Sequence, residues 1–193
     1  MNDLFKFMIR LTLFCIGCLF LSLASHAQIS ISGQPLPFIP TKSLSEELFI
    51  QMPAFDLKEQ LRIDSLEATD LRNGYRFAYK FIGNYTPSNS GIRFTLPNGT
   101  KVWRLGIHSP GAYSLNVMFS EYHLPEGARL FLYNEDQTEI LGAFSQLNNS
   151  ELGLLPIAPL LGDKLIIEYQ EPAQVSFPGK LTLGEINHGY RHF

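Results

Sequence analysis

Hydrophobic and polar residues alternate with a period of two along much of the chain after residue 74. The clearest segments are residues 76–81, 92–96 and 103–108. In the last of these, Trp103, Leu105 and Ile107 alternate with Arg104 and His108. A period of two is typical of a β-strand with one buried and one solvated face. The pattern therefore predicts three strands and places Trp103 in the core with Leu105 and Ile107.

Turn-forming residues separate these segments and mark further ones. Between the second and third segments, Asn98-Gly99 predicts a tight hairpin turn with a positive φ at both positions. Six more apolar segments follow, separated by stretches rich in Gly, Pro, Asn and Asp: 115–119, 128–133, 140–144, 154–158, 164–169 and 180–183. About nine short strands without a long helix predict an all-β fold over residues 74–193. We expect an antiparallel, jelly-roll-like β-sandwich.

Residues 28–73 lack this regularity, and we interpret them as an irregular N-terminal leader. Four prolines punctuate its first half, and charged residues mix with leucines in its second half. Asp56, with Glu59 three residues later, would suit the start of a helix, so a short helix and an extended leader both stay open. We interpret the carboxylates of Asp56, Asp64 and Asp70 as solvated loop groups rather than as acid–base catalysts.

Residues 1–27 have the layout of a secretory signal peptide. Lys6 and Arg10 precede an apolar run over residues 11–23, and small residues follow up to Ala27. We expect cleavage between Ala27 and Gln28, which predicts a secreted or periplasmic protein. A membrane-spanning helix needs about 20 apolar residues, so we expect no anchor after removal of the signal.

Cys15 and Cys18, the only two cysteines, both lie in this apolar run. Their surroundings faintly resemble a lipoprotein processing site, and their C-x-x-C spacing could also suggest a metal or redox pair. The apolar run continues beyond Cys18, which favours ordinary signal-peptide residues. The mature chain would then be a thiol-free domain of 166 residues, stabilised by its core alone.

Charge excludes two classes of partner. Of the 15 basic and 18 acidic residues, the signal segment removes Lys6, Arg10 and Asp3, which leaves 13 basic and 17 acidic residues. An acidic balance without runs of like charge does not favour nucleic acid or an anionic membrane as a partner.

Candidate catalytic chemistry is sparse. The histidines of the mature chain, His108, His123, His188 and His192, do not stand at metal-ligand spacings, and no G-D-S-G or G-x-S-x-G nucleophile motif occurs. We therefore predict no catalytic residue, metal or cofactor. The abundant aromatic residues are interpreted as core, and stacking on a sugar or peptide is kept as the alternative.

Several ordered blocks resemble the region upstream of the trypsin-like domain in bacterial lysyl endopeptidase-like proteases. The longest block, residues 102–116, is similar to that family's W-x-L-x-I-x-S-x-x-A-x-S-L-N segment. The similar blocks are 102–116 (VWRLGIHSPGAYSLN), 124–134 (LPEGARLFLYN), 142–144 with 148–149, 162–172 (GDKLIIEYQEP) and 186–191 (INHGYR). The resemblance covers residues 76–191 and is weaker over the leader.

The resemblance implies a prodomain that helps a trypsin-like serine protease domain to fold, or covers its active site. In relatives the catalytic domain follows in the same chain. It implies a junction near His188, Gly189, Tyr190 and Arg191. A complete relative continues beyond this point, whereas the sequence stops at Phe193, so we expect a truncated gene product or a stand-alone module. The alternative function is a stand-alone extracellular module that binds carbohydrate or protein. Direct hydrolysis by this chain is the least favoured hypothesis.

Overall fold

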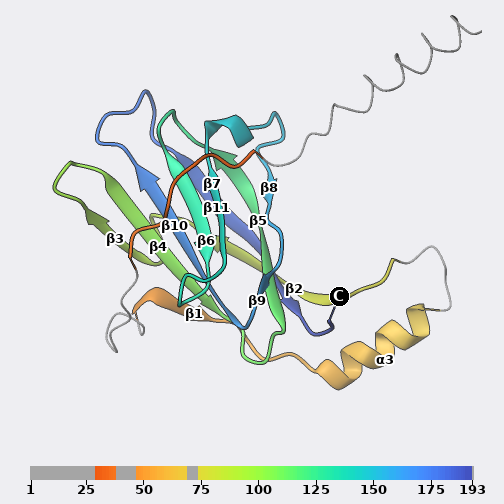
Figure 1. Ribbon diagram of the computed structural model, residues 1–193. Helices are drawn as coiled ribbons and strands as arrows, with labels where there is room; N and C mark the ends of the chain where they lie inside the picture. The colour runs from red at the N-terminus through yellow and green to blue at the C-terminus, as the bar shows by residue number, and fades with distance from the viewer. Residues whose placement is uncertain (1–28, 38–46, 69–73, 193) are drawn as a thin grey trace, which may run out of the picture.

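The computed structural model describes residues 29–37, 47–68 and 74–192. In this part the fold is mostly β, with two sheets of six and five strands that form a sandwich-like structure and one short α-helix (Figure 1). The predicted signal peptide and its cleavage site at Ala27 and Gln28 lie outside the described residues, as does Asp70. None of the helices described there has the length and apolar character needed to cross a membrane.

The six-stranded sheet has β4 and β10 at its centre. Its order is β1-β4-β10-β6-β7, and β3 pairs with the first half of β4. The β1–β4 pair is parallel and the other pairs are antiparallel. Its strands are β1 (Phe49–Gln51), β3 (Ile92–Thr95), β4 (Lys101–His108), β6 (Arg129–Tyr133), β7 (Ile140–Phe144) and β10 (Lys164–Glu171).

The five-stranded sheet is built around the last strand of the chain. Its order is β2-β11-β5-β8, and β9 also pairs with β5. β11 lies between β2 and β5, antiparallel to both, and its register shifts near Leu183. The strands are β2 (Ala78–Tyr85), β5 (Ser114–His123), β8 (Leu155–Pro156), β9 (Leu160–Leu161) and β11 (Lys180–Gly189).

All nine predicted segments contain a strand, and the described residues hold two more, β1 and β9. Trp103, Leu105 and Ile107 lie in the main core between the sheets, as the alternation predicts. The side chains that this core buries most fully come from both sheets: Leu105, Ile107, Val117, Phe119, Tyr122, Leu130, Leu132, Ile167, Leu183 and Ile186.

The prediction of a solvated outer face is wrong for β4. Six consecutive residues of β4 are buried, and Arg104 is only 6% exposed. The leader is the reason, because residues 29–37 cross the outer face of the six-stranded sheet in Figure 1 and Ile31 exchanges backbone hydrogen bonds with Ala143 of β7. A second apolar cluster lies on this face: Leu48, Phe131, Tyr133, Ala143 and Ile166. The outer faces of β4, β6 and β10 are therefore interior surface.

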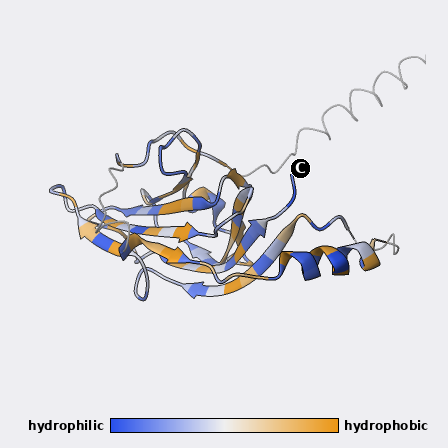
Figure 2. Cartoon of the chain, turned by 90° about the horizontal axis from the view of Figure 1, so that it is seen from below, coloured by the Kyte–Doolittle hydropathy of each residue, from blue (hydrophilic) through white to orange (hydrophobic). Residues whose placement is uncertain are grey.

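Of the two alternatives left open for the leader, the structure has the helix, α3 (Leu57–Glu67). Asp56 is its N-cap and accepts a hydrogen bond from the backbone N–H of Glu59 at 3.0 Å, which satisfies one of the unpaired amides of the first turn. The Glu59 side chain pairs with Arg62. α3 lies to one side of the sandwich and carries both hydrophilic and hydrophobic residues (Figures 1 and 2).

The hairpin between β3 and β4 forms where the sequence predicts it, but its turn type differs. Gly99 has a φ of 83°, while Asn98 is absent from the positive-φ residues. Gly99 N–H donates to Leu96 O, and Leu96 N–H donates to Thr100 O. This is a type I turn followed by a bulge at glycine. Pro97 explains the difference, because its ring holds φ near −65°, which suits the first central position of a type I turn.

Candidate functional site

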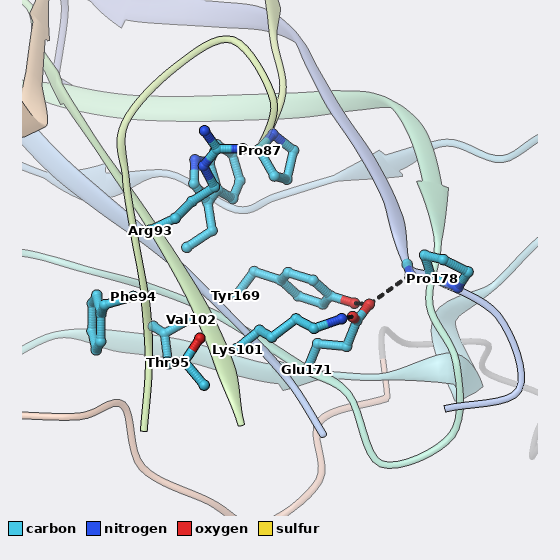
Figure 3. Close-up of a pocket in the computed structure, with 11 residues that line it drawn as sticks. Pro87, Arg93, Phe94, Thr95, Lys101, Val102, Tyr169, Glu171 and Pro178 are labelled. Carbon is cyan, nitrogen blue, oxygen red and sulfur yellow. Dashed lines mark hydrogen bonds and ion pairs between the residues drawn. The ribbon is translucent and has the colours of Figure 1, made fainter. Parts of the chain in front are cut away.

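A cavity of about 310 Å³ opens at one end of the sandwich, where β3 and β10 end and β4 begins (Figure 3). The antiparallel registers place its side chains in two rows. Arg93, Trp103 and Tyr169 are opposite one another on β3, β4 and β10. Thr95, Lys101 and Glu171 form the next row. Two loops close the sides, one through Pro87 and the other through Pro178 and Gly179.

The cavity floor is aromatic and firmly held. Trp103 is 2% exposed and Tyr169 is 6% exposed, although both line the cavity. The indole N–H of Trp103 donates to the carbonyl of Ser90 at 2.7 Å, so the polar end of the ring is satisfied by the loop before β3. These rings present a preformed apolar surface.

The negative charge of Glu171 is balanced by its partners within the cavity wall. Its carboxylate accepts hydrogen bonds from Tyr169 Oη at 2.8 Å and from the backbone N–H of Gly179 at 2.7 Å, and it pairs with Lys101 Nζ at 3.3 Å. Burial opposes ionisation, but these hydrogen bonds hold the pKa of Glu171 below its usual range. Burial, followed by the Glu171 contact, raises the pKa of Tyr169. Glu171 therefore stays ionised and holds the cavity wall together through these contacts. It is not placed to transfer protons.

Unlike Lys101 and Glu171, Arg93 has no partner among the residues that line this cavity. Its side chain is exposed, and it forms no hydrogen bond or ion pair with the part of the chain that the structure describes. Figure 3 shows Arg93 with Pro87 on one side of the cavity and Glu171 with Pro178 on the other. The arrangement can hold a small apolar group beside a negative charge.

A second cavity, of about 330 Å³, lies between the leader and the loop after β4. Ser109 Oγ and His188 Nδ1 meet there at 2.7 Å, although they are 79 residues apart in the sequence. Phe55 of the leader packs edge-on against the His188 ring, with centroids 4.8 Å apart. Burial lowers the pKa of His188, against the opposing charge of Asp163, so the ring is neutral at pH 7.

This contact has one part of a serine-hydrolase arrangement without the rest. Ser109 is 1% exposed, so a substrate carbonyl cannot reach its hydroxyl in this conformation. Among the described residues, no carboxylate forms a hydrogen bond with the His188 ring to orient it. The pair therefore joins β11 to the loop after β4.

The four residues predicted as a protease junction lie at and just beyond the end of β11. His188 and Gly189 belong to the strand, and His188, Gly189 and Tyr190 are buried. Asp64 of the leader joins α3 to Tyr190 and Arg191, just beyond β11. The interpretation of Asp64 as a solvated carboxylate is wrong, because it is 7% exposed. It lies on α3 and receives hydrogen bonds from four side chains: Gln60 (2.9 Å), Arg76 (3.0 Å), Tyr190 (2.7 Å) and Arg191 (2.9 Å).

We call Asp64 and these four side chains the Asp64 clamp. Burial disfavours the Asp64 carboxylate, but the hydrogen bonds from Tyr190, Gln60 and Arg76 and the charge of Arg191 together hold its pKa below the usual value. Burial and Asp64 raise the pKa of Tyr190 to about 12. The clamp therefore stabilises the fold through an ionised Asp64.

The clamp predicts a pH-dependent effect of Asp64→Asn. A lowered folded-state pKa contributes stability that is present above the unfolded pKa of about 3.9 and is lost as the pH falls through the folded value. At pH 7 the variant should be less stable by about 2 kcal/mol, because hydrogen bonds to a charged acceptor are weakened. Urea unfolding should show this difference shrinking at a pH below about 3.9. Glu126→Gln, at an exposed turn, is the control, and equal losses for both variants at pH 7 would contradict the role of the clamp.

No protein-family model matches the chain. Over residues 29–37, 47–68 and 74–192, no group of three or more His, Cys, Asp or Glu side chains is arranged to hold a metal ion. The candidate features are thus the aromatic cavity and the Asp64 clamp.

Proposed function

We propose that this chain is an exported, non-catalytic β-sandwich that acts as a prodomain-like partner of a lysyl endopeptidase-like serine protease domain. It would be secreted or periplasmic, and it would aid the folding of the protease or cover its active site. The observation that carries the proposal is the Asp64 clamp, which ties α3 to the residues where the resemblance puts the junction. A junction held rigidly beside a helix suits a module that positions a second domain.

Helix α3 supplies the contact surface in this proposal. Leu57 and Leu61 are 42% and 38% exposed and lie one turn apart on the same helix face. Exposed apolar residues beside a fixed junction favour a protein contact there. A partner that binds the folded protease domain stabilises it by mass action, and the same contact blocks substrate if it covers the cleft.

We also infer that the sandwich is a jelly roll. Without the three short strands β1, β3 and β9, the sheets have the orders β2-β11-β5-β8 and β4-β10-β6-β7. The chain alternates between the two sheets in the manner of two Greek keys, which supports this topology.

The test supplies a lysyl endopeptidase catalytic domain in trans. The purified mature chain alone should not cleave lysyl substrates, because its sequence holds no G-D-S-G or G-x-S-x-G nucleophile motif and, among the described residues, the serine hydrogen-bonded to a histidine, Ser109, is buried. At about micromolar concentration it should slow hydrolysis by the protease or raise its refolding yield, through an interface of roughly 1,200–2,000 Å². The double variant Leu57→Ser with Leu61→Ser should weaken this effect about tenfold or more.

Leu152→Ser is the matched control, since Leu152 is 80% exposed in the loop before β8. A folded chain that neither inhibits nor improves refolding would contradict the proposal. Equal losses in the helix and loop variants would contradict the assignment of the surface to α3.

The second candidate function is a stand-alone extracellular module that binds carbohydrate or protein. The aromatic cavity at the end of the sandwich is the observation that favours it. Protein is the better ligand class, because Trp103 is only 2% exposed and does not offer the open ring face on which a sugar stacks.

A further inference from the structure

We infer that the cavity between β3, β4 and β10 binds the C-terminal residue of a peptide, with an aromatic side chain inside and the terminal carboxylate on Arg93. This inference does not rest on the proposed partnership with a protease. It concerns the opposite end of the molecule from α3, which lies far from β3 in Figure 1.

The size and lining of the cavity determine which side chain of a bound peptide can enter it. A volume of about 310 Å³ lies at the lower limit of small-ligand pockets, so it accommodates one ring-sized group rather than an extended ligand. Trp103, Tyr169 and Val102 make the apolar surface, and Pro87 and Pro178 stand at its sides. An aromatic side chain fills such a space with few rotatable bonds to immobilise.

The charges of the cavity determine which charged group the ligand must carry beside its aromatic ring. Lys101 is paired with Glu171, and Glu171 also accepts from Tyr169 and Gly179, so these groups balance one another. Arg93 forms no ion pair with any described residue and lines the same cavity. A guanidinium presents parallel N–H donors that match a carboxylate, so the ligand should bring a carboxylate beside its ring.

The edge of the sheet favours a peptide over a free aromatic acid. Within the described chain, β3 pairs only with β4, so its other edge has backbone groups without a strand partner. An extended peptide can add to such an edge and gain main-chain hydrogen bonds. Since Arg93 is itself a residue of β3, a peptide that runs along this strand can end at Arg93 and turn its last side chain into the cavity.

The experiment uses Trp103 as the reporter, because it is the only tryptophan of the chain and part of the cavity floor. The probes are acetyl-Gly-Gly-Phe with a free carboxylate, the same peptide as its C-terminal amide, and phenylacetate. The acid should change the Trp103 fluorescence and bind in calorimetry. The amide and phenylacetate should each bind at least about tenfold more weakly. The amide lacks the carboxylate for Arg93, and phenylacetate lacks the peptide backbone that pairs with β3.

Arg93→Gln should weaken binding of the acid by about tenfold to a hundredfold, and Arg93→Lys by less, because lysine keeps the charge and loses the fork. Arg62→Gln, on the exposed surface of α3, should leave binding unchanged and serves as the matched control. Thermal unfolding would verify that all three variants are folded.

Three results would overturn the inference. The first is equal binding of the acid and the amide, and the second is equal binding of phenylacetate and the tripeptide. The third is no binding of the acid by the wild-type chain at about millimolar concentration.

Discussion

Replacing Arg104 with alanine is expected to destabilise the fold by about 3–5 kcal/mol, because it leaves a buried carboxylate without its counter-ion. Glu168 is fully buried, and Arg104 Nε lies 2.7 Å from its Oε2 atom. Tyr133 Oη donates to the same oxygen, and the backbone N–H of Leu36 donates to the other. Arg104 also donates to the carbonyls of Leu36 and Pro37, so the variant should loosen the leader as well.

Urea unfolding followed by circular dichroism measures this effect. Arg129→Ala is the control, because Arg129 is exposed on β6, two strands away from β4 in the same sheet, and should change stability by no more than about 0.5 kcal/mol. The double variant Arg104→Met with Glu168→Leu should regain only part of the loss, since apolar side chains of similar volume can replace a buried ion pair, but the Tyr133 hydroxyl and the Leu36 amide then lose their acceptor. A cost for Arg104→Ala no greater than that for Arg129→Ala would contradict the argument.

Trp103→Ala is expected to cost about 3–5 kcal/mol, because it removes the largest fully buried side chain and opens a void in the core. It also deprives the Ser90 carbonyl of its indole donor. A loss of this size would consume much of the stability of a domain of about this length. The variant has no tryptophan, so its unfolding must be followed by far-ultraviolet circular dichroism rather than by fluorescence.

Phe94→Ala provides the comparison, since Phe94 is an aromatic residue on the adjacent strand that is 36% exposed. Its loss should cost roughly 1 kcal/mol. If Trp103→Ala instead leaves stability at the wild-type value and abolishes ligand binding, Trp103 is a recognition residue rather than part of the core.

The strands were predictable because their signal is local. A period of two depends only on neighbours along the chain and marks three of the predicted segments, while short apolar runs between turn-forming residues mark the other six, and all nine contain a strand. The cover on the outer face was not predictable from that alternation, since Leu36 and Arg104 are 68 residues apart. Unbroken apolar runs at residues 130–133 and 165–167 did carry a signal for it, because strands buried on both faces lose their alternation.

The site features depend on register and on long-range contacts. Trp103 could be assigned to the core from its own strand, but the row of Arg93, Trp103 and Tyr169 exists only once three strands are aligned. Asp64 could not be identified from its sequence neighbours, since two of its partners, Tyr190 and Arg191, are 126 and 127 residues away.

Because β11 lies between β2 and β5, the five-stranded sheet can be completed only late in folding. All the other described strands precede β11 in the sequence, so β2 and β5 cannot be joined in one sheet until this last strand is present. Loop closure over such separations is slow, and until it occurs β2 and β5 have open edges that could pair with other chains. We therefore expect folding to finish only after the chain has been made or released as far as Gly189. A chaperone that shields strand edges should raise the yield more than one that accelerates local turns.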